Sequence, residues 1–451
     1  MKKYINIALL ALVALTSISL SSCKNEVDEI FDKDPVTRLA EAKAQYTDIL
    51  TSNGGKWQLE YYANTEEPGY IYLMTFKKDG SVTISGMNKW ISYIINGTMN
   101  APAFGSDVSM WDVITDNGPV LSLNTYNKYF HLFADPYDIP SSGSTTSDTD
   151  VNENGYGHEG NYEFDIMKYS GDTLYLTGKK PTQNGRFLNM IMTRVAENID
   201  DEVYMNEVTA MADSFFNAKV PQVYINLPNG VRWIVKEGAT SILKMFREDA
   251  DEISTSEKHN VIITHDGLSF MDPINLDGYI IQNFVRQSDG SLLCRDDNQT
   301  TMTADKLSNV FSSKNLVWRS DLSDVGGAFS DLVAQIGQEL KDYNKSTLMY
   351  AQLAYNADSA AYALSFNVKK GSVRYNPTYF MTMTVKGDNK ISFTVEPVGD
   401  KMGETYATKC PSMRAFADRF AAEYDLSATS ILAPVYMKMS NSGNYIVWTM
   451  Q

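Results

Sequence analysis

The chain has 451 residues, of which 55 are acidic and 39 are basic, so its formal charge at neutral pH is −16. This length exceeds that of one small domain and allows two or three domains with separate cores. The excess of negative charge repels phosphate backbones, and we therefore expect no nucleic-acid partner.

The first 22 residues have the pattern of a secretory signal peptide. Lys2 and Lys3 precede an apolar run over residues 5–20, and small residues follow it. The tetrapeptide Leu20-Ser21-Ser22-Cys23 resembles the lipobox of bacterial lipoprotein precursors. That resemblance implies that Cys23 is acylated and becomes the first residue of the mature protein. Its several acyl chains would give lasting attachment, whereas one chain binds a membrane only marginally.

An acid-rich segment, residues 23–34, follows the leader. Its start, Lys24-Asn25-Glu26-Val27-Asp28-Glu29, resembles the signal with which Bacteroidetes send lipoproteins to the outer face of the outer membrane. The alternative is a flexible acidic tether that carries no export signal, and attachment at the periplasmic face would then be equally consistent with the sequence. No later run reaches the roughly 20 apolar residues that a spanning helix needs. We therefore expect a water-soluble body that lipid anchors to the outer membrane, at the cell surface.

Residues 35–195 are predicted to form a helix followed by an antiparallel meander. Asp34 suits the N-cap of the helix and Pro35 its first position, and Asn53-Gly54-Gly55 ends it. Alternation then predicts strands at residues 57–61, 70–76, 82–84, 120–123, 129–133, 162–166 and 174–176. Short turns between consecutive strands favour a meander or a lipocalin-like barrel.

Residues 196–451 are predicted to form a C-terminal α+β region. A division of this region into two subdomains near residue 320 is an alternative. Helical periodicity covers residues 197–219 and 329–343, and a last helix is predicted over residues 411–424. Strands are predicted at residues 223–225, 231–235, 261–264, 268–270, 279–285, 382–385, 391–395 and 445–448. We therefore expect a mainly β chain of the α+β class.

The polar stretch 141–160 contains the best metal candidate. Three oxygen-bearing residues have the spacing of positions one, three and five in a calcium loop, namely Asp150, Asn152 and Asn154. Gly155 stands at the sixth position, but the twelfth is Asn161 rather than a bidentate Glu, for which Glu159 or Glu163 could substitute. The alternative is a polar loop that binds no metal. Calcium is thus the one cofactor that the sequence suggests.

Histidine is scarce, with four residues in the chain: His131, His158, His259 and His265. His158-Glu159 lacks the second His of a zinc-protease helix, because Tyr162 stands in its place. His131 lies on one face of the predicted strand 129–133. There it would either line a pocket or serve as a hydrogen-bonded barrel residue. His259 and His265 flank a short strand in polar company, and we assign both to the surface.

Motifs of known catalytic sites are missing from the chain. There is no Gly-x-Ser-x-Gly elbow and no Gly-rich phosphate loop, while paired carboxylates of a glycosidase are recognised only by their separation in space. After Cys23, Cys294 and Cys410 are the remaining cysteines. A disulfide between them would be permitted outside the cytoplasm, and two separate buried thiols fit equally.

Several blocks of the first half resemble a known family. They are Trp57-Gln58-Leu59-Glu60-Tyr61-Tyr62, Phe76-Lys77-Lys78-Asp79-Gly80-Ser81-Val82-Thr83, residues 118–127, His131-Leu132-Phe133-Ala134-Asp135-Pro136 and Tyr162-Glu163-Phe164. In this order and spacing they are similar to the Bacteroidetes lipoprotein family catalogued as domain of unknown function 4302. The resemblance covers approximately residues 34–195. It implies association with outer-membrane nutrient importers of the SusC and SusD type and supplies no catalytic residues.

The leader, the acidic segment and the resemblance together favour a non-catalytic surface lipoprotein. We expect it to capture a glycan or peptide for a nutrient importer, or to assist the importer in another way. A surface hydrolase whose acidic residues and His131 meet only in the folded chain is an alternative from a different class. A structural or assembly partner of the importer is a third.

Overall fold

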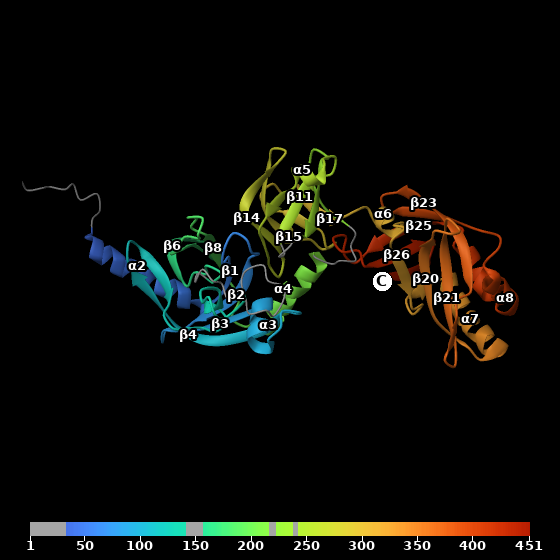
Figure 1. Cartoon of the computed structure of the whole chain (residues 1–451), viewed down its shortest axis with the longest axis horizontal. Coiled ribbons are helices and arrows are strands. Elements are labelled where there is room, and N and C mark those ends of the chain that lie inside the picture. The colour runs from blue at the N-terminus through green and yellow to red at the C-terminus, as the bar shows by residue number, and fades with distance from the viewer. Residues whose placement is uncertain (1–32, 141–156, 216–221, 238–241) are drawn as a thin grey trace, which may run out of the picture.

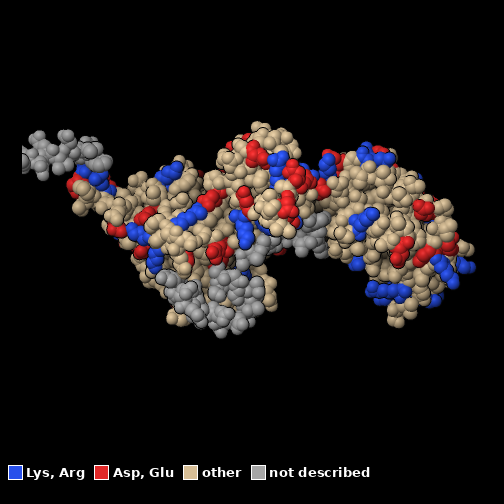
Figure 2. All heavy atoms as spheres, turned by 45° about the horizontal axis from the view of Figure 1, so that its top comes forward, with Lys and Arg blue, Asp and Glu red and all other residues tan. Residues whose placement is uncertain are grey.

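The computed structural model describes residues 33–140, 157–215, 222–237 and 242–451. Three β-sheets, each built from a consecutive part of the chain, follow one another along the longest axis of the molecule (Figure 1). Acidic and basic side chains are interspersed along the molecule on the face shown in Figure 2. The chain is mainly β within the α+β class, as the alternation of its residues predicts. In the described ranges, no helix has the length and apolar character needed to cross a bilayer.

The first sheet is a closed barrel of eight strands that pair in chain order. The strands are β1 (Lys56–Tyr61), β2 (Tyr70–Phe76), β3 (Ser81–Asn88), β4 (Ala103–Thr115), β5 (Pro119–Leu123), β6 (Glu163–Ser170), β7 (Thr173–Gly178) and β8 (Asn189–Arg194). β1 closes the barrel by pairing antiparallel with β8, where Trp57 lies opposite Arg194. This up-and-down order is that of a lipocalin-like barrel and confirms the predicted meander. Helix α3 (Lys89–Asn96) follows β3.

Helix α2 (Pro35–Thr51) precedes the barrel and begins as predicted. The Asp34 side chain accepts a hydrogen bond of 3.0 Å from the backbone N of Thr37, and proline occupies the first turn. The 3-10 turn η1 (Asn53–Gly55) ends the helix. Gly55 has a φ of 67°, and a Cβ at this position would lie 2.2 Å from the carbonyl O of Phe76. Only glycine allows the turn to approach the barrel so closely.

The second sheet has nine antiparallel strands and is preceded by helix α4 (Asp201–Phe215). Its strands are β9 (Val223–Asn226), β10 (Arg232–Glu237), β11 (Leu243–Arg247), β12 (Glu257–His259), β13 (Val261–Ile263), β14 (Gly267–Leu276), β15 (Tyr279–Arg286), β16 (Leu292–Cys294) and β17 (Thr301–Ala304), with the short helix α5 (Glu252–Thr255) before β12. β17 returns to pair with β9. β12 and β13 form the two edges of this sheet, although Asn260 alone separates them along the chain.

The third sheet also closes on itself, because β18 (Val317–Ser320) pairs with both β20 and β27. Its other strands are β19 (Val325–Gly326), β20 (Thr347–Asn356), β21 (Ala361–Lys370), β22 (Val373–Tyr375), β23 (Thr378–Gly387), β24 (Lys390–Val395), β25 (Glu423–Ala428), β26 (Tyr436–Asn441) and β27 (Asn444–Met450). Its helices are α6 (Leu307–Phe311), α7 (Ala328–Asn344), α8 (Lys401–Lys409) and α9 (Pro411–Arg419). All three sheets are thus antiparallel, and most neighbouring strands in each are consecutive in the chain.

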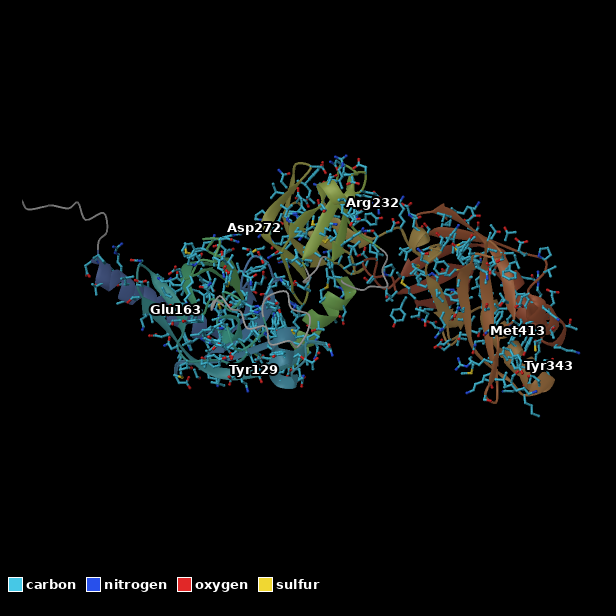
Figure 3. All side chains as sticks on the ribbon, viewed as in Figure 1. Tyr129, Glu163, Arg232, Asp272, Tyr343 and Met413 are labelled. Carbon is cyan, nitrogen blue, oxygen red and sulfur yellow. The ribbon has the colours of Figure 1, made fainter. Side chains whose placement is uncertain are left out.

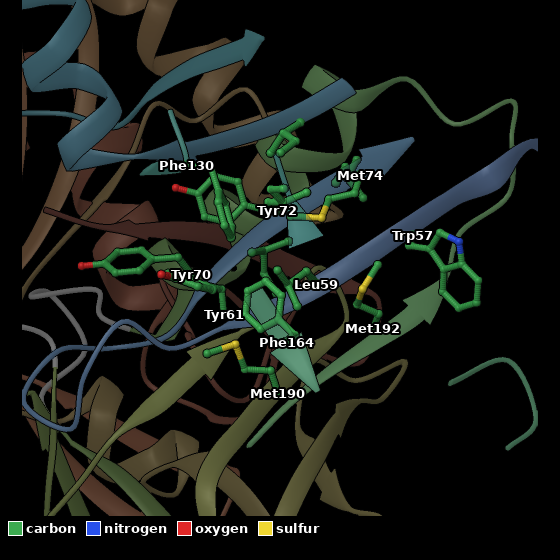
Figure 4. Packing of buried hydrophobic residues seen from close by; sticks show 14 of the residues in the cluster. Trp57, Leu59, Tyr61, Tyr70, Tyr72, Met74, Phe130, Phe164, Met190 and Met192 are labelled. Carbon is green, nitrogen blue, oxygen red and sulfur yellow. The ribbon is translucent and has the colours of Figure 1, made fainter. Parts of the chain in front are cut away.

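Side chains fill the centre of the first barrel (Figure 4). Tyr61 lies at its middle, with ring centroids 4.8 Å from Phe130, 5.5 Å from Phe133 and 6.0 Å from Tyr72. Such packed aromatic pairs each add about 0.5–1.5 kcal/mol beyond the burial of their area. Because aromatic rings occupy the position that a ligand takes in an open barrel, a binding site has to be sought elsewhere.

Two predicted elements are wrong. Residues 129–133 form no strand; they include the 3-10 turn η2 (His131–Phe133). Phe130 and Phe133 insert into the barrel core, and the hydroxyl of Tyr72 donates to the carbonyl O of Tyr129 at 2.7 Å. The last helix ends at Arg419 rather than at Tyr424, which lies in β25.

Candidate functional site

A cleft of about 590 Å³ lies between the outer face of the first barrel, the second sheet and helix α4. Its apolar lining includes Ile191, Ile199 and Phe284. Its hydrogen-bonding and ionisable lining includes Gln58, Glu60, Tyr204, His265, Asp266 and Arg295. We call this space the inter-sheet cleft. Its size and mixed lining are those of a site for a small molecule.

Strand β1 contributes to the cleft because it is buried on both faces. Trp57, Leu59 and Tyr61 belong to the barrel core, so alternation directs Gln58 and Glu60 outward. These two polar side chains are nevertheless buried, at 5% and 8% exposure. The second sheet and α4 cover them, which makes the outer face of β1 the floor of the cleft.

Direct contacts hold the second sheet against the barrel. The backbone N of Gly69 donates to the carbonyl O of Val261 at 2.8 Å, and the amide of Asn260 donates to the carbonyl O of Glu67 at 2.9 Å. Ile262 is fully buried within the core cluster of the barrel. The two walls of the cleft therefore share a packed core and hydrogen bonds, which preorganises the space between them.

A chain of hydrogen bonds crosses the cleft. The Tyr204 hydroxyl donates to Oε1 of Gln58 at 2.5 Å and lies 2.7 Å from Nδ1 of His265. Burial raises the pKa of Tyr204 above its ordinary value, so the phenol keeps its proton at neutral pH. Because the hydroxyl has a single proton and gives it to Gln58, His265 is the donor in the other bond.

Asp266 and Arg295 form an ion pair at the mouth of the cleft. Nη2 of Arg295 lies 3.3 Å from Oδ2 of Asp266, and the hydroxyl of Thr264 donates to Oδ1 of Asp266 at 2.8 Å. The two charged side chains are 62% and 42% exposed. Each charge is thus neutralised by the other, in contact with water.

Glu60 stands out because its buried carboxyl group has no direct partner. No hydrogen bond or ion pair involves its carboxyl group among the described residues, although the residue is 8% exposed. Burial raises the pKa of Glu60 to about 7, and the negative charge of Asp266 adds to this while Arg295 opposes it. At neutral pH the carboxyl group is therefore poised between its two protonation states, which is common at functional sites.

Glu67 and His158 form a second buried pair, within the barrel. Oε1 of Glu67 lies 2.5 Å from Nδ1 of His158, and Nε2 of His158 lies 2.6 Å from the carbonyl O of Pro140. Because a carbonyl only accepts, Nε2 carries a proton, and a further proton lies between the imidazole and the carboxyl group. Tyr70 donates to Oε2 of Glu67 at 2.9 Å, and Asn64 donates to Oε1 at 2.8 Å. This carboxyl group is fully partnered.

His131 is buried rather than placed on a strand face. Its Nδ1 accepts a hydrogen bond of 3.0 Å from the backbone N of Asn127. Its ring lies between those of Tyr126 and Tyr162, with centroids 5.4 Å and 5.0 Å away. His131 does not line the inter-sheet cleft. These contacts are those of a hydrogen-bonded packing residue.

Several predicted site residues lie outside the described residues: Cys23, Asp150, Asn152 and Asn154. The two suggested substitutes for a calcium ligand are described and have other partners. Oε2 of Glu159 accepts from the backbone N of Gln183 at 3.0 Å, and Oε1 of Glu163 accepts from the hydroxyl of Ser122 at 3.0 Å. Within the described ranges, no three His, Cys, Asp or Glu side chains are grouped to hold a metal ion.

Cys294 and Cys410 are free thiols, each fully buried. Cys294 ends β16 in the second sheet, and Cys410 lies between α8 and α9 of the third. Burial raises the pKa of each thiol to about 11. Both are thus unreactive packing residues, and no disulfide joins them.

No sequence motif predicts that the cleft residues form a site. The alternation of residues 57–61 predicts a strand but does not say what covers Gln58 and Glu60, and the polar neighbours of His265 predict a surface position. The available signals were the two polar residues Gln58 and Glu60, which alternate with apolar ones in the block 57–62, and the polar turn His265-Asp266 far along the chain. Neither signal says that these segments meet.

Comparison with protein families gives a match over residues 27–288, which is more than half of the chain. This chain belongs to the family described as Domain of unknown function (DUF4302). The matched range spans the first barrel, α4 and the second sheet through β15. The family region therefore includes every cleft residue discussed above except Arg295. No curated protein matches the chain.

Proposed function

We propose that this protein is a lipid-anchored binding protein of the outer membrane of Bacteroidetes, which captures a small polar ligand at the cell surface. Cys23 is the anchor in this proposal, on the strength of the leader and of residues 20–23. The ligand, of glycan or peptide origin, would pass to an importer of the SusC and SusD type. The inter-sheet cleft is the binding site.

The observation that carries this proposal is the buried carboxyl group of Glu60 on the floor of a preorganised cleft. Burying an ionised carboxylate without a partner costs several kcal/mol. Nothing in the barrel requires a carboxyl group there, since Glu60 lies on the outer face of β1. An incoming ligand is the partner that would satisfy it.

Binding to glycan and peptide arrays tests the proposal directly. Ser269 lines the cleft, so Ser269→Phe should fill it and reduce binding of any captured ligand by about tenfold or more. Thr382→Phe adds the same bulk to an exposed strand position of the third sheet and should leave binding unchanged. Equal losses in both variants, or no ligand for the unaltered protein, would contradict the proposal.

A second candidate function is hydrolysis, and one observation favours it. A carboxyl group with a pKa of about 7 suits general acid or base catalysis at neutral pH, and Asp266 supplies a second carboxylate nearby. Turnover of a captured glycan or peptide, abolished by Glu60→Gln, would select this function. Tight binding without turnover would select capture.

Anchoring is tested separately from binding. Labelled palmitate should enter the native protein, and Cys23→Ser should move it from the membrane fraction to the soluble fraction. Co-purification of an outer-membrane receptor with the native protein would support association with an importer. Retention of the Cys23→Ser variant in the membrane fraction would contradict lipid anchoring.

A further inference from the structure

We propose that the ligand of the inter-sheet cleft carries a protonated primary amine, and that Glu60 is the group that binds it. This inference rests on the proposed capture function and names the chemistry of the ligand. Amino sugars and free peptide amino termini both present such a group. The argument depends on which charges of the cleft are already compensated.

The cations near the cleft are engaged with other partners. Arg295 pairs with Asp266 at 3.3 Å. Arg194 donates to the carbonyl oxygens of Ser52 and Ile49, at 2.8 and 3.0 Å, and its guanidinium lies over the ring of Trp57. Neither guanidinium contacts Glu60. Arg295 therefore acts on Glu60 only through space, and the ionised carboxyl group has no cation in direct contact among the described residues of the cleft.

An amine fits the groups that surround this carboxyl group. Gln58 and Glu60 project from the same face of β1, two residues apart. Oε1 of Gln58 accepts one bond from Tyr204 and retains a second lone pair. A protonated amine has three N–H donors, so it can serve both oxygen groups at once, while Ile191, Ile199 and Phe284 contact the carbon skeleton.

A metal ion or a neutral hydroxyl group fits the cleft less well. Metal ions need several ligands, and no such group of side chains exists in the part of the chain that the structure describes. A hydroxyl group can bond to the carboxylate but leaves its charge uncompensated in a buried site. A cationic donor supplies both the hydrogen bond and the charge.

Proton release accompanies amine binding if Glu60 is the acceptor. In the free protein its pKa is about 7, so close to half of the molecules carry a proton there at neutral pH. The other titratable and charged groups near it are Tyr62 directly after β1, Tyr204 from α4, Tyr175 from β7, His265 and Asp266 from the turn before β14, Arg295 after β16, and Arg194 from β8. A cation lowers the pKa of Glu60, and affinity should rise with pH up to about 7.

Calorimetry with matched probes tests the inference. The sugar arm compares glucosamine with glucose, and the peptide arm compares a short peptide having a free amino terminus with its acetylated form. In at least one arm, the amine should bind about tenfold more tightly than its neutral match. Titrations in buffers of different ionisation enthalpy should show release of about half a proton at about pH 7.

Two variants assign the effect to Glu60. Glu60→Gln should remove the preference for the amine and the proton release, which separates Glu60 from His265. Glu163→Gln, on β6 of the same barrel and labelled in Figure 3, makes the same chemical change outside the cleft and should keep both. Both variants should retain the circular dichroism spectrum of the unaltered protein.

The outcomes separate the two proposals. If an array ligand binds in a manner sensitive to Ser269→Phe, but neither amine is preferred or the preference survives Glu60→Gln, this inference fails and capture stands. If no ligand is lost on Ser269→Phe, the capture function itself fails.

Discussion

Glu60 and Glu67 are buried glutamates only seven residues apart, and the protein treats them in opposite ways. Glu67 accepts hydrogen bonds from Tyr70 and Asn64 and shares a proton with His158. Glu60 has no such partner among the described residues, and its pKa is raised to about 7. One carboxyl group belongs to the barrel, and the other faces a cleft of about 590 Å³.

The comparison teaches that burial alone does not identify a functional carboxylate. A fully partnered carboxyl group stabilises the fold, and its removal leaves other buried groups unsatisfied. An unpartnered one lowers the stability of the protein, so a role outside folding has to account for its presence. The same substitution, Glu to Gln, should therefore change stability in opposite directions at the two positions.

The largest effect is expected for Glu67→Gln. The amide removes the charge and the shared proton, which leaves His158 and the donors around it poorly matched in a dry site. We expect the free energy of unfolding to fall by about 3 kcal/mol or more, measured by urea denaturation at about pH 7. The partly exposed Glu163→Gln should change it by less than about 0.5 kcal/mol. A loss below about 1 kcal/mol for Glu67→Gln would show that the network contributes little.

A smaller effect of opposite sign is expected for Glu60→Gln. The carboxyl group ionises near pH 4.5 in the unfolded chain and at about 7 in the folded protein. Below pH 4.5, Glu60 does not change the free energy of unfolding. Between pH 4.5 and about 7 it lowers that free energy progressively, and above about 7 the loss reaches about 3 kcal/mol. Glu60→Gln should recover up to that amount at about pH 8. Denaturation curves at several pH values should lose this slope in the variant, and an unchanged slope would contradict the raised pKa.

The smallest effect is expected for Asp266→Asn, which tests whether the charge of Asp266 contributes to the raised pKa of Glu60. The charge of Asp266 raises the pKa of Glu60 and that of Arg295 lowers it. Removing the carboxylate also frees Arg295 from its ion pair, so both changes lower the pKa of Glu60, by less than about one pH unit. Titration of the Glu60 carboxyl carbon by NMR measures this directly. An upward movement would mean that Asp266 is not the neighbour whose charge matters.

Local patterns predicted much of the fold because the interactions that decide it lie between neighbouring residues. Asp34 caps α2 through the backbone of Thr37, three residues on. The strand predicted at residues 129–133 is wrong because Phe130 and Phe133, three residues apart at a 3-10 turn, both insert into the barrel core. The predicted end of the last helix is also wrong, because Tyr424 lies in β25, where it pairs with Ile391 of β24.

The sequence by itself determined the alternation that makes antiparallel meanders, the cap of the first helix and the lipobox-like leader, because each depends on residues close in the chain. Only the tertiary structure decided that Glu60 is buried, since the residues that cover it, Tyr204 and His265, stand more than 140 positions away. Desolvation depends on every neighbour in space, and a strand pattern specifies only which side of the strand a residue occupies.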